Sequence, residues 1–227
     1  MSTSTLSSIL DQTLSTPTAF NLQPYHVLLV STPAQKELLK PAMLGGNTGR
    51  VCDSNLTAIF LSDLEPSKRI PRILDLETAS KSRTPDYLVH LPLSASFFTG
   101  EGGHLSNLLK AGALSTLSPS KPVPHPGTVE GWANKNTGMA AMTYILACES
   151  AGYATCAMEG FDAERVKIAF NIPDRYAIPM MIATGLSDDG EADKVKSTPR
   201  LEKEETVFFG GFGQTGALEV MYDDKQT

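Results

Sequence analysis

Two short segments carry the groups best suited to holding a flat polar ligand. The first, residues 17–25, places the amides of Asn21 and Gln23 between two prolines, and each amide can both donate and accept hydrogen bonds. The second, residues 157–161, places Gly160 in a turn, where the absence of a side chain permits close approach of a ligand to the backbone. Neither segment holds an obvious nucleophile or general base. This combination is typical of a protein whose cofactor carries the chemistry while the chain supplies binding, orientation and electrostatics.

Each segment also has a purely structural interpretation. Asn21 could make a local turn hydrogen bond in a loop between a helix and a strand. Gly160 could form a turn before a helix that is capped by Asp162. Arg50, taken alone, is typical of a solvated surface charge. The residue types by themselves leave both interpretations open.

The hydrophobic pattern of the first 62 residues predicts the elements that would position the first segment. Apolar residues three to four apart predict an amphipathic helix over residues 5–15, ending before Pro17. Short apolar runs predict buried strands over residues 26–30 and 56–61, with a helix over residues 34–42 between them. Two strands joined by a helical crossover fit an α/β or α+β layer.

A similar pattern surrounds the second segment. Residues 130–151 are apolar on nearly all sides and predict a buried helix, with Gly152 at its C-terminal end. A short strand over residues 153–157 follows, then a helix from Asp162 to Phe170 and a buried strand over residues 178–184.

The remaining regions are less regular. Residues 65–127 show only modest helical stretches and end in a Pro-rich loop at 118–127, so we interpret them as an insertion that caps the core. An aromatic strand expected at residues 206–209 has no later helix to cover it, which favours pairing with the sheet of a second subunit. We expect a single domain over residues 1–227, with a C-terminal extension over about residues 199–227.

Composition excludes several classes of function. Hydrophobic residues make up 41% of the 227 and charged residues 19%, as in a soluble globular protein. The net charge of −6 and the lack of clustered Lys and Arg argue against nucleic-acid binding. No apolar run approaches a membrane span, and the N-terminus lacks a signal-peptide pattern, so we expect a cytoplasmic protein. The three widely spaced cysteines, Cys52, Cys148 and Cys156, predict reduced thiols and no zinc site.

Other catalytic assignments have weaker support. His26 and Asp53 could join a serine in a hydrolase triad, but no Gly-x-Ser-x-Gly elbow occurs. His104 and His125 lie in Gly- and Pro-rich loops without ligand partners at metal spacing. The glycines at 210–213 lack the following helix of a nucleotide-binding loop. We therefore expect no metal site.

The first segment resembles the Pro-Ser-Ser-x-Asn-x-Gln-Pro-Trp signature of the FMN-dependent nitroreductase family. The positions that match are Pro17, Asn21, Gln23 and Pro24. The positions that differ are Thr18 and Ala19 in place of the two serines, and Tyr25 in place of Trp. In that family the loop reaches the ribityl chain and ring of an FMN held mainly by the other subunit. The resemblance thus implies an FMN site shared by two copies of this chain.

The second segment resembles the family's Pro-Ile-Glu-Gly-Phe-Asp stretch, which here reads Ala157-Met158-Glu159-Gly160-Phe161-Asp162. The resemblance implies that this backbone lies against the N5 edge of the flavin. The amides of Glu159 and Gly160 would then donate hydrogen bonds to N5 and O4.

Further matches follow in order along the chain. Asn47 and Arg50 fall where the family carries an Asn and a basic residue, and a cation near flavin N1 and O2 stabilises the anionic reduced ring. Asn136 falls at a flavin-contacting Gln or Asn. Arg200 falls where a late Arg contacts the FMN phosphate, a partner that suits a bidentate guanidinium.

The sequence departs from the family pattern in two places. The family's N-terminal Arg-(Arg or His)-Ser segment has no counterpart, and Thr198 stands where some relatives carry a second basic residue. Either the sequence lacks its true start or its affinity for FMN is reduced.

The resemblance spans residues 5–62 and 130–201. It implies an α+β nitroreductase-like fold, with a mostly antiparallel sheet flanked by helices and a C-terminal strand exchanged in a homodimer. It also implies an FMN-dependent oxidoreductase in which NADH or NADPH reduces the flavin, and a nitroaromatic, quinone or similar acceptor reoxidises it by a ping-pong mechanism. No catalytic side chain is required. The residues expected to contact FMN are Pro17, Thr18, Ala19, Asn21, Gln23, Asn47, Arg50, Asn136, Ala157, Met158, Glu159, Gly160 and Arg200.

Two other functions remain open. The first is a non-catalytic flavin-binding or regulatory relative of the same fold. The second is a flavin enzyme with another reaction, such as dehydrogenation or reductive dehalogenation. The capping region at residues 65–127 would separate these functions, and its sequence pattern does not decide between them.

Overall fold

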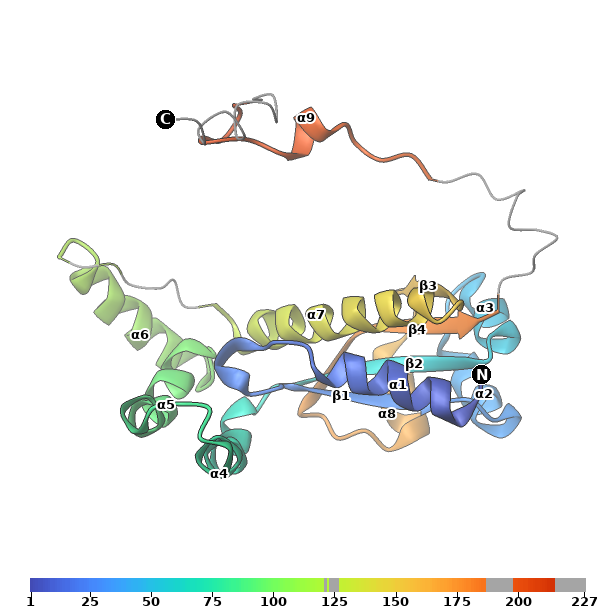
Figure 1. The fold of residues 1–227 in the computed structure, drawn as a ribbon, viewed down its shortest axis with the longest axis horizontal. Helices are drawn as coiled ribbons and strands as arrows, with labels where there is room; N and C mark the ends of the chain where they lie inside the picture. Colours follow the sequence, from blue (N-terminus) through green and yellow to red (C-terminus); the bar gives the residue numbers. More distant parts are fainter. Residues whose placement is uncertain (121, 123–126, 187–197, 215–227) are drawn as a thin grey trace. The chain divides into compact units, whose positions relative to one another are not determined.

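The computed structural model describes residues 1–120, 122, 127–186 and 198–214. The chain divides into two units, Met1–Ser187 and Asp188–Thr227. The first unit contains the sheet and most of the helices (Figure 1).

The centre of the first unit is a four-stranded antiparallel sheet. Its strands are β1 (Tyr25–Val30), β2 (Leu56–Asp63), β3 (Ala154–Met158) and β4 (Tyr176–Gly185). The order across the sheet is β1-β2-β4-β3, and every neighbouring pair is antiparallel. All eight residues of β2 are buried, as expected for a central strand covered on both faces. The α+β fold with a mostly antiparallel sheet is confirmed.

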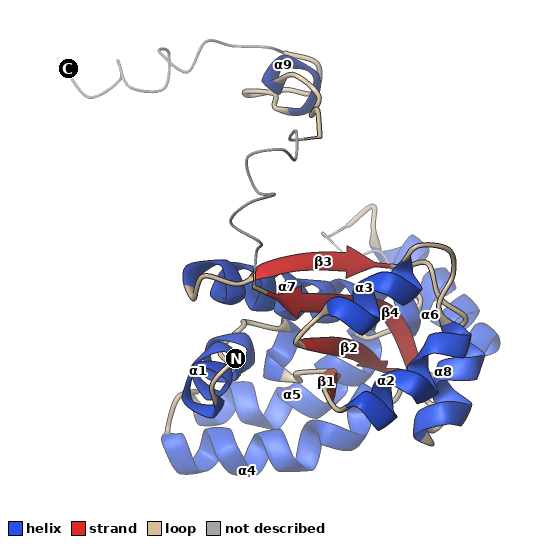
Figure 2. Cartoon of the chain, turned by 90° about the vertical axis from the view of Figure 1, so that its right-hand side faces the viewer, coloured by secondary structure: helices blue, strands red, loops and turns tan. Residues whose placement is uncertain are grey.

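Helices cover both faces of the sheet. The helices on one face are α1 (Thr3–Leu14) and α7 (Val129–Ser150). Those on the other face are α2 (Pro33–Leu39), α3 (Asn47–Asp53) and α8 (Ala163–Phe170), as Figure 2 shows. Successive strand residues point to opposite faces. Phe60 of β2 accordingly packs against Tyr144 of α7, and Ile59 lies in the cluster that contains Val166 of α8.

The region that we interpret as a capping insertion is largely helical. It contains the 3-10 turn Pro66–Arg69 and the helices α4 (Ile70–Ser80), α5 (Pro85–Phe98) and α6 (Gly103–Leu117). A separate hydrophobic cluster joins α4 and α5 to Trp132 of α7 and to Leu22. The cluster therefore packs against the loop between α1 and β1, which contains the first predicted segment.

The second unit contains one short helix, α9 (Lys203–Thr206), within its described residues 198–214. The strand expected at residues 206–209 is not formed in the single chain. The start of this segment is helical instead, because Thr206 ends α9 and the backbone N–H of Val207 donates to the carbonyl of Lys203 at 2.7 Å. A strand would need the edge of another strand to pair its backbone groups. Exchange between subunits therefore stays a prediction.

The helices of the described residues lack the length and apolarity that crossing a membrane requires. Among the same residues, no group of three or more His, Cys, Asp or Glu side chains is arranged to hold a metal ion. The cysteines of the described residues, Cys52, Cys148 and Cys156, are free thiols.

Candidate functional site

The loop of residues 17–25, called here the amide loop, has an unusual backbone. Three of its non-glycine residues have positive φ: Phe20 at 57°, Asn21 at 54° and Gln23 at 46°. This left-handed region costs a non-glycine residue roughly 1 kcal/mol. Such a loop persists only where surrounding groups hold it, and the structure provides a contact at its start, middle and end.

Asn136 holds the start of the amide loop. Its Oδ1 accepts a hydrogen bond from the backbone N–H of Ala19 at 2.8 Å, and its Nδ2 donates to the carbonyl of Trp132 at 2.8 Å. The side chain is fully buried in α7. Within the loop, the Thr18 hydroxyl accepts from the backbone N–H of Gln23 at 3.0 Å. The amide of Asn136 is thus engaged in supporting the loop, and direct contact with a ligand stays a prediction.

Glu77 of α4 holds the middle of the loop. Its Oε1 accepts from Nδ2 of Asn21 at 3.1 Å. Gln23 in turn donates from Nε2 to Asn21, at 3.3 Å to the backbone carbonyl and at 3.1 Å to Oδ1. The two amides of the motif therefore bind one another and a buried carboxylate.

Arg69 holds the end of the loop. Its guanidinium donates to the backbone carbonyls of Gln23 and, at 3.2 Å, of Tyr25. Arg69 is itself positioned by Asp63 at 3.4 Å, and Arg175 contacts the same carboxylate at 2.8 Å. Asp63 is fully buried, so two cations compensate its charge.

His26 lies directly after the loop, against the same arginine. Its Nε2 is 2.6 Å from Arg69 Nη2. Because a guanidinium only donates, Nε2 must accept, which requires a neutral imidazole. Burial, followed by the charge of Arg69, lowers the pKa of His26, although Asp63 acts in the opposite direction.

The second predicted segment meets α3 in a compact arrangement, called here the α3 cluster (Asn47, Arg50, Glu159 and Gly160). Asn47 donates from Nδ2 to the carbonyl of Gly160 at 2.9 Å, and Arg50 donates from Nη1 to Asn47 Oδ1. The backbone N–H of Leu44 donates to the same Gly160 carbonyl at 3.0 Å. The structure thus brings together four of the residues that the sequence predicted for the site.

Gly160 is required here for a reason that the sequence did not indicate. A Cβ at this position would lie 2.7 Å from Asn47 Nδ2. The close approach that needs a glycine is therefore already made within the chain, by Asn47. This contact fixes the turn after β3 against α3.

The α3 cluster offers hydrogen-bond donors and a positive charge. Among the described residues, no acceptor is recorded for the backbone N–H groups of Glu159 and Gly160. Arg50 is exposed, and its recorded partner is the neutral Asn47. Ala157 is exposed and Met158 is buried in the core beneath the turn. Two successive free amides beside a cation fit the electronegative edge of a flavin, so the residues present are compatible with the cofactor that the resemblance implies.

The amide loop and the α3 cluster lie far apart in the single chain. The loop leads into β1 and the cluster follows β3, and these strands form opposite edges of the sheet. The two edge strands lie three strand spacings apart. Tyr25 of β1 is level with Ala177 of β4, whereas Met158 of β3 is level with Met181, four residues further along. Together these offsets separate the two groups by roughly 20 Å. Figure 1 shows the loop before β1 near α4 and α5, with α3 at the other end of the sheet.

Four predicted residues lie outside both groups of contacts: Ala157 and Met158, described above, and Pro17 and Arg200. Pro17 is exposed at the start of the amide loop. Arg200 belongs to the second unit, where its Nη1 donates to the Thr198 hydroxyl at 2.6 Å. Its contact with an FMN phosphate stays a prediction.

The sequence interpretation missed Glu77 and Arg69. Glu77 could have been found, because it follows Ile70 and Ile73 at helical spacing and thus places a charge on the buried face of α4. Arg69 lies in the turn before α4 and belongs to no periodic pattern of residues. The neighbouring sequence therefore does not indicate that its side chain reaches the loop.

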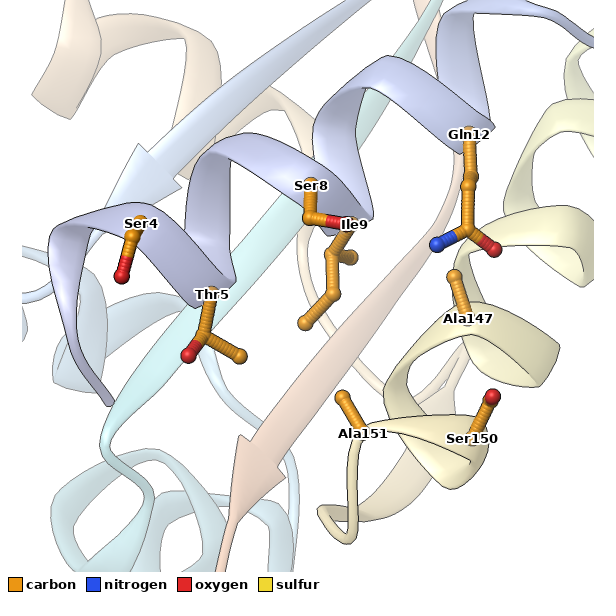
Figure 3. Close-up of a pocket in the computed structure, with 8 residues that line it drawn as sticks. All are labelled: Ser4, Thr5, Ser8, Ile9, Gln12, Ala147, Ser150 and Ala151. Carbon is orange, nitrogen blue, oxygen red and sulfur yellow. The ribbon is translucent and has the colours of Figure 1, made fainter.

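Two pockets of the first unit lie away from the predicted site. One, of about 410 Å³, lies between α1 and the end of α7 (Figure 3). Its side chains are Ser4, Thr5, Ser8, Ile9, Gln12, Ala147, Ser150 and Ala151. The other, of about 430 Å³, is lined mainly by apolar residues with His26 and Tyr176. Neither is lined by a residue predicted to contact FMN.

Comparison with known proteins identifies the family of the fold. The model of the nitroreductase family matches residues 1–186. YodC of Bacillus subtilis, provisionally named an NAD(P)H nitroreductase, is 25% identical over 180 residues, which cover 79% of this chain and 76% of YodC. The crystal structure of the B. subtilis protein ydfN, provisionally named a nitroreductase, superposes with a TM-score of 0.72 at 24% identity, covering 92% of this chain and 88% of ydfN. A nitroreductase-like protein of Exiguobacterium sibiricum, solved in complex with FMN, gives a TM-score of 0.67 at 18% identity and covers 92% and 87% of the two chains. Because the family model matches residues 1–186 and the fold and motifs agree with it, the chain belongs to the nitroreductase family.

Proposed function

We propose that the protein is an FMN-dependent oxidoreductase that takes electrons from NADH or NADPH and reduces nitroaromatics, quinones or similar acceptors. The observation that carries this proposal is the α3 cluster, in which two free backbone amides and an exposed Arg50 lie together. Family membership supports it, and the FMN complex of the Exiguobacterium relative supports the identity of the cofactor.

Bound FMN would supply the hydride-transfer chemistry. The backbone N–H groups of Glu159 and Gly160 would donate to acceptor atoms on the edge of the flavin ring. The guanidinium of Arg50 would stabilise negative charge on the reduced ring. Asn47 orients Arg50 through its Oδ1 and fixes the turn through its Nδ2. No general base is needed among these residues, so a ping-pong exchange between donor and acceptor is the mechanism that we propose.

The separation of the two groups supports a homodimer. A flavin contacted by both the amide loop and the α3 cluster needs one group from each of two chains, because within one chain they lie on opposite edges of the sheet. The surface of α7 offers a candidate interface. Met139, Met142 and Leu146 are 40%, 49% and 58% exposed and recur at helical spacing on one face. Exposed apolar stripes of this kind mark association surfaces.

Spectroscopy of the purified protein tests the proposal. We expect flavin absorbance bands, either as purified or after addition of FMN, and bleaching when NADH or NADPH is added without oxygen. Addition of a quinone or a nitroaromatic compound should then restore the oxidised spectrum. A protein that stays colourless in excess FMN would contradict the proposal.

Other outcomes of the same experiment distinguish the alternatives. Bound FMN that neither NADH nor NADPH bleaches would support a non-catalytic flavin-binding relative. Bleaching without reoxidation by quinones or nitroaromatics would favour another flavin reaction, such as a dehydrogenation or a dehalogenation. We further expect the protein to be cytoplasmic, as its sequence predicts.

A further inference from the structure

Glu77 is a carboxylate buried beneath the amide loop, only 3% exposed, on the apolar face of α4. Its Oε1 accepts from Asn21 Nδ2, and Arg83 Nε lies 3.8 Å from the same oxygen. Its Oε2 is buried, with no hydrogen-bond partner among the described residues. A buried charge with so few partners is costly to fold.

A carboxylate at this position determines the direction of a chain of hydrogen bonds. An ionised carboxylate only accepts, so Asn21 must turn its Nδ2 toward Glu77. The Oδ1 of Asn21 then faces Gln23, whose Nε2 donates to it at 3.1 Å. The backbone carbonyl of Asn21, 3.3 Å from the same Nε2, favours the same direction. The Oε1 of Gln23 is left without a recorded partner among the described residues, and the side chain is half-buried.

We propose that Glu77 is a positioning residue that fixes the direction of the side-chain amides of Asn21 and Gln23. The amide loop then offers the side-chain oxygen of Gln23, Oε1, to an N–H donor of the ligand. The ligand part rests on the proposed function, because the imide N–H of an oxidised isoalloxazine is such a donor. The orientation part rests only on the contacts within the chain.

A thermal double-mutant cycle on the flavin-free protein tests the orientation. Glu77→Gln replaces a carboxylate, which can only accept, by an amide that can also donate, so the direction is no longer enforced. Gln23→Glu places a second carboxylate against Asn21. In the double variant the chain can run in reverse, with Gln at 77 donating to Asn21 Oδ1 and Asn21 Nδ2 donating to Glu at 23. We expect each single variant to lower Tm by about 3–8 °C, and the double variant to recover at least half of the loss of Gln23→Glu.

The control is Asp75→Asn, which removes an exposed carboxylate from the same helix and should leave Tm unchanged. A double variant whose loss equals the sum of the two single losses would overturn the orientation. A Glu77→Gln protein with the Tm of Asp75→Asn would overturn it too. A purely structural role for Glu77 predicts no rescue by a second substitution that adds a charge.

Flavin titration tests the consequence for the ligand. We expect Glu77→Gln to bind FMN about tenfold more weakly than the wild type, as measured by quenching of flavin fluorescence, and Asp75→Asn to bind it equally well. FMN methylated on its imide nitrogen should bind the wild type more weakly, but should lose little further affinity in Glu77→Gln. Equal loss in both proteins would overturn the ligand part. A wild type that binds no FMN would overturn the proposed function and the ligand part together, whereas the thermal cycle would still decide the orientation.

Discussion

Replacement of Gly160 by Ala tests the central contact of the α3 cluster. The new Cβ would lie 2.7 Å from Asn47 Nδ2, well inside the 3.4 Å at which ordinary contact begins. Asn47 cannot swing away easily, because it is 92% buried and both ends of its amide are engaged, by Gly160 and Arg50. The substitution must therefore break or distort the Asn47–Gly160 hydrogen bond.

The expected cost combines two effects. A lost hydrogen bond is worth about 1 kcal/mol, and a buried donor left partly unsatisfied adds about 1 kcal/mol or more. A loss of about 2 kcal/mol corresponds to a fall in Tm of about 4–8 °C for a chain of this size. We also expect weaker FMN binding, because Arg50 loses the Asn47 amide that orients it.

Thermal unfolding of matched variants provides the measurement. Gly112→Ala, in the interior of α6, has no atom within 4 Å of its new Cβ and should raise Tm by about 1–4 °C, since Ala is the better helix former. Asn47→Ala with Gly160→Ala should lose less than the sum of the two single losses, because removal of the Asn47 amide makes room for the methyl group. A Gly160→Ala protein as stable as the wild type, or strictly additive losses, would refute the close packing.

Further predictions concern charge, association and pH. Arg50→Gln should weaken FMN binding about tenfold in a fluorescence titration, because it removes the cation of the α3 cluster. Met142→Glu should convert the proposed dimer to monomers in sedimentation, because it places a charge in the apolar stripe of α7. His26 has a folded-state pKa below its unfolded value of about 6.5, so the unfolded state binds more protons between the two values. The free energy of unfolding should therefore fall as pH is lowered through 6.5, and it should fall less steeply in His26→Asn.

Each of these predictions has a matched comparison. Arg72→Gln removes another exposed guanidinium, on α4, and should leave FMN binding unchanged; equal effects of the two substitutions would argue against Arg50 as a ligand. Ile168→Glu adds a charge at an 81% exposed position on α8, and a monomer in that variant would show that α7 is not specifically involved. Parallel stability curves for the wild type and His26→Asn between pH 5 and 7 would mean that His26 does not titrate as its contact with Arg69 requires.

The sequence predicts elements well where hydrophobic periodicity is strong. The helix expected at residues 130–151 is α7 at 129–150, and the strand expected at 56–61 is β2 at 56–63. The helices of the capping region were not predicted individually. Pro71 and Pro85 lie at the starts of α4 and α5, where proline is tolerated, yet in the sequence they resemble chain breaks.

The predicted site separates into residues that local pattern could reveal and residues that it could not. The resemblance located Asn47, Arg50 and Gly160, which the structure brings into contact. It could not reveal that the glycine at position 160 makes room for the side chain of Asn47, because the two positions are 113 residues apart. Long-range partners of this kind leave no local trace in a single sequence.

The contacts of the amide loop also change the interpretation of its motif. Asn21 and Gln23 direct their amide nitrogens toward Glu77 and toward each other, so their main recorded contacts are within the protein. A loop with three residues in the left-handed region needs such contacts to keep its shape. A loop that is already ordered loses less conformational entropy when it binds a ligand, and this favours affinity. The motif therefore acts first through the shape of the loop, and under the proposed function its two amides would serve a ligand by fixing which groups, such as Gln23 Oε1, the loop presents.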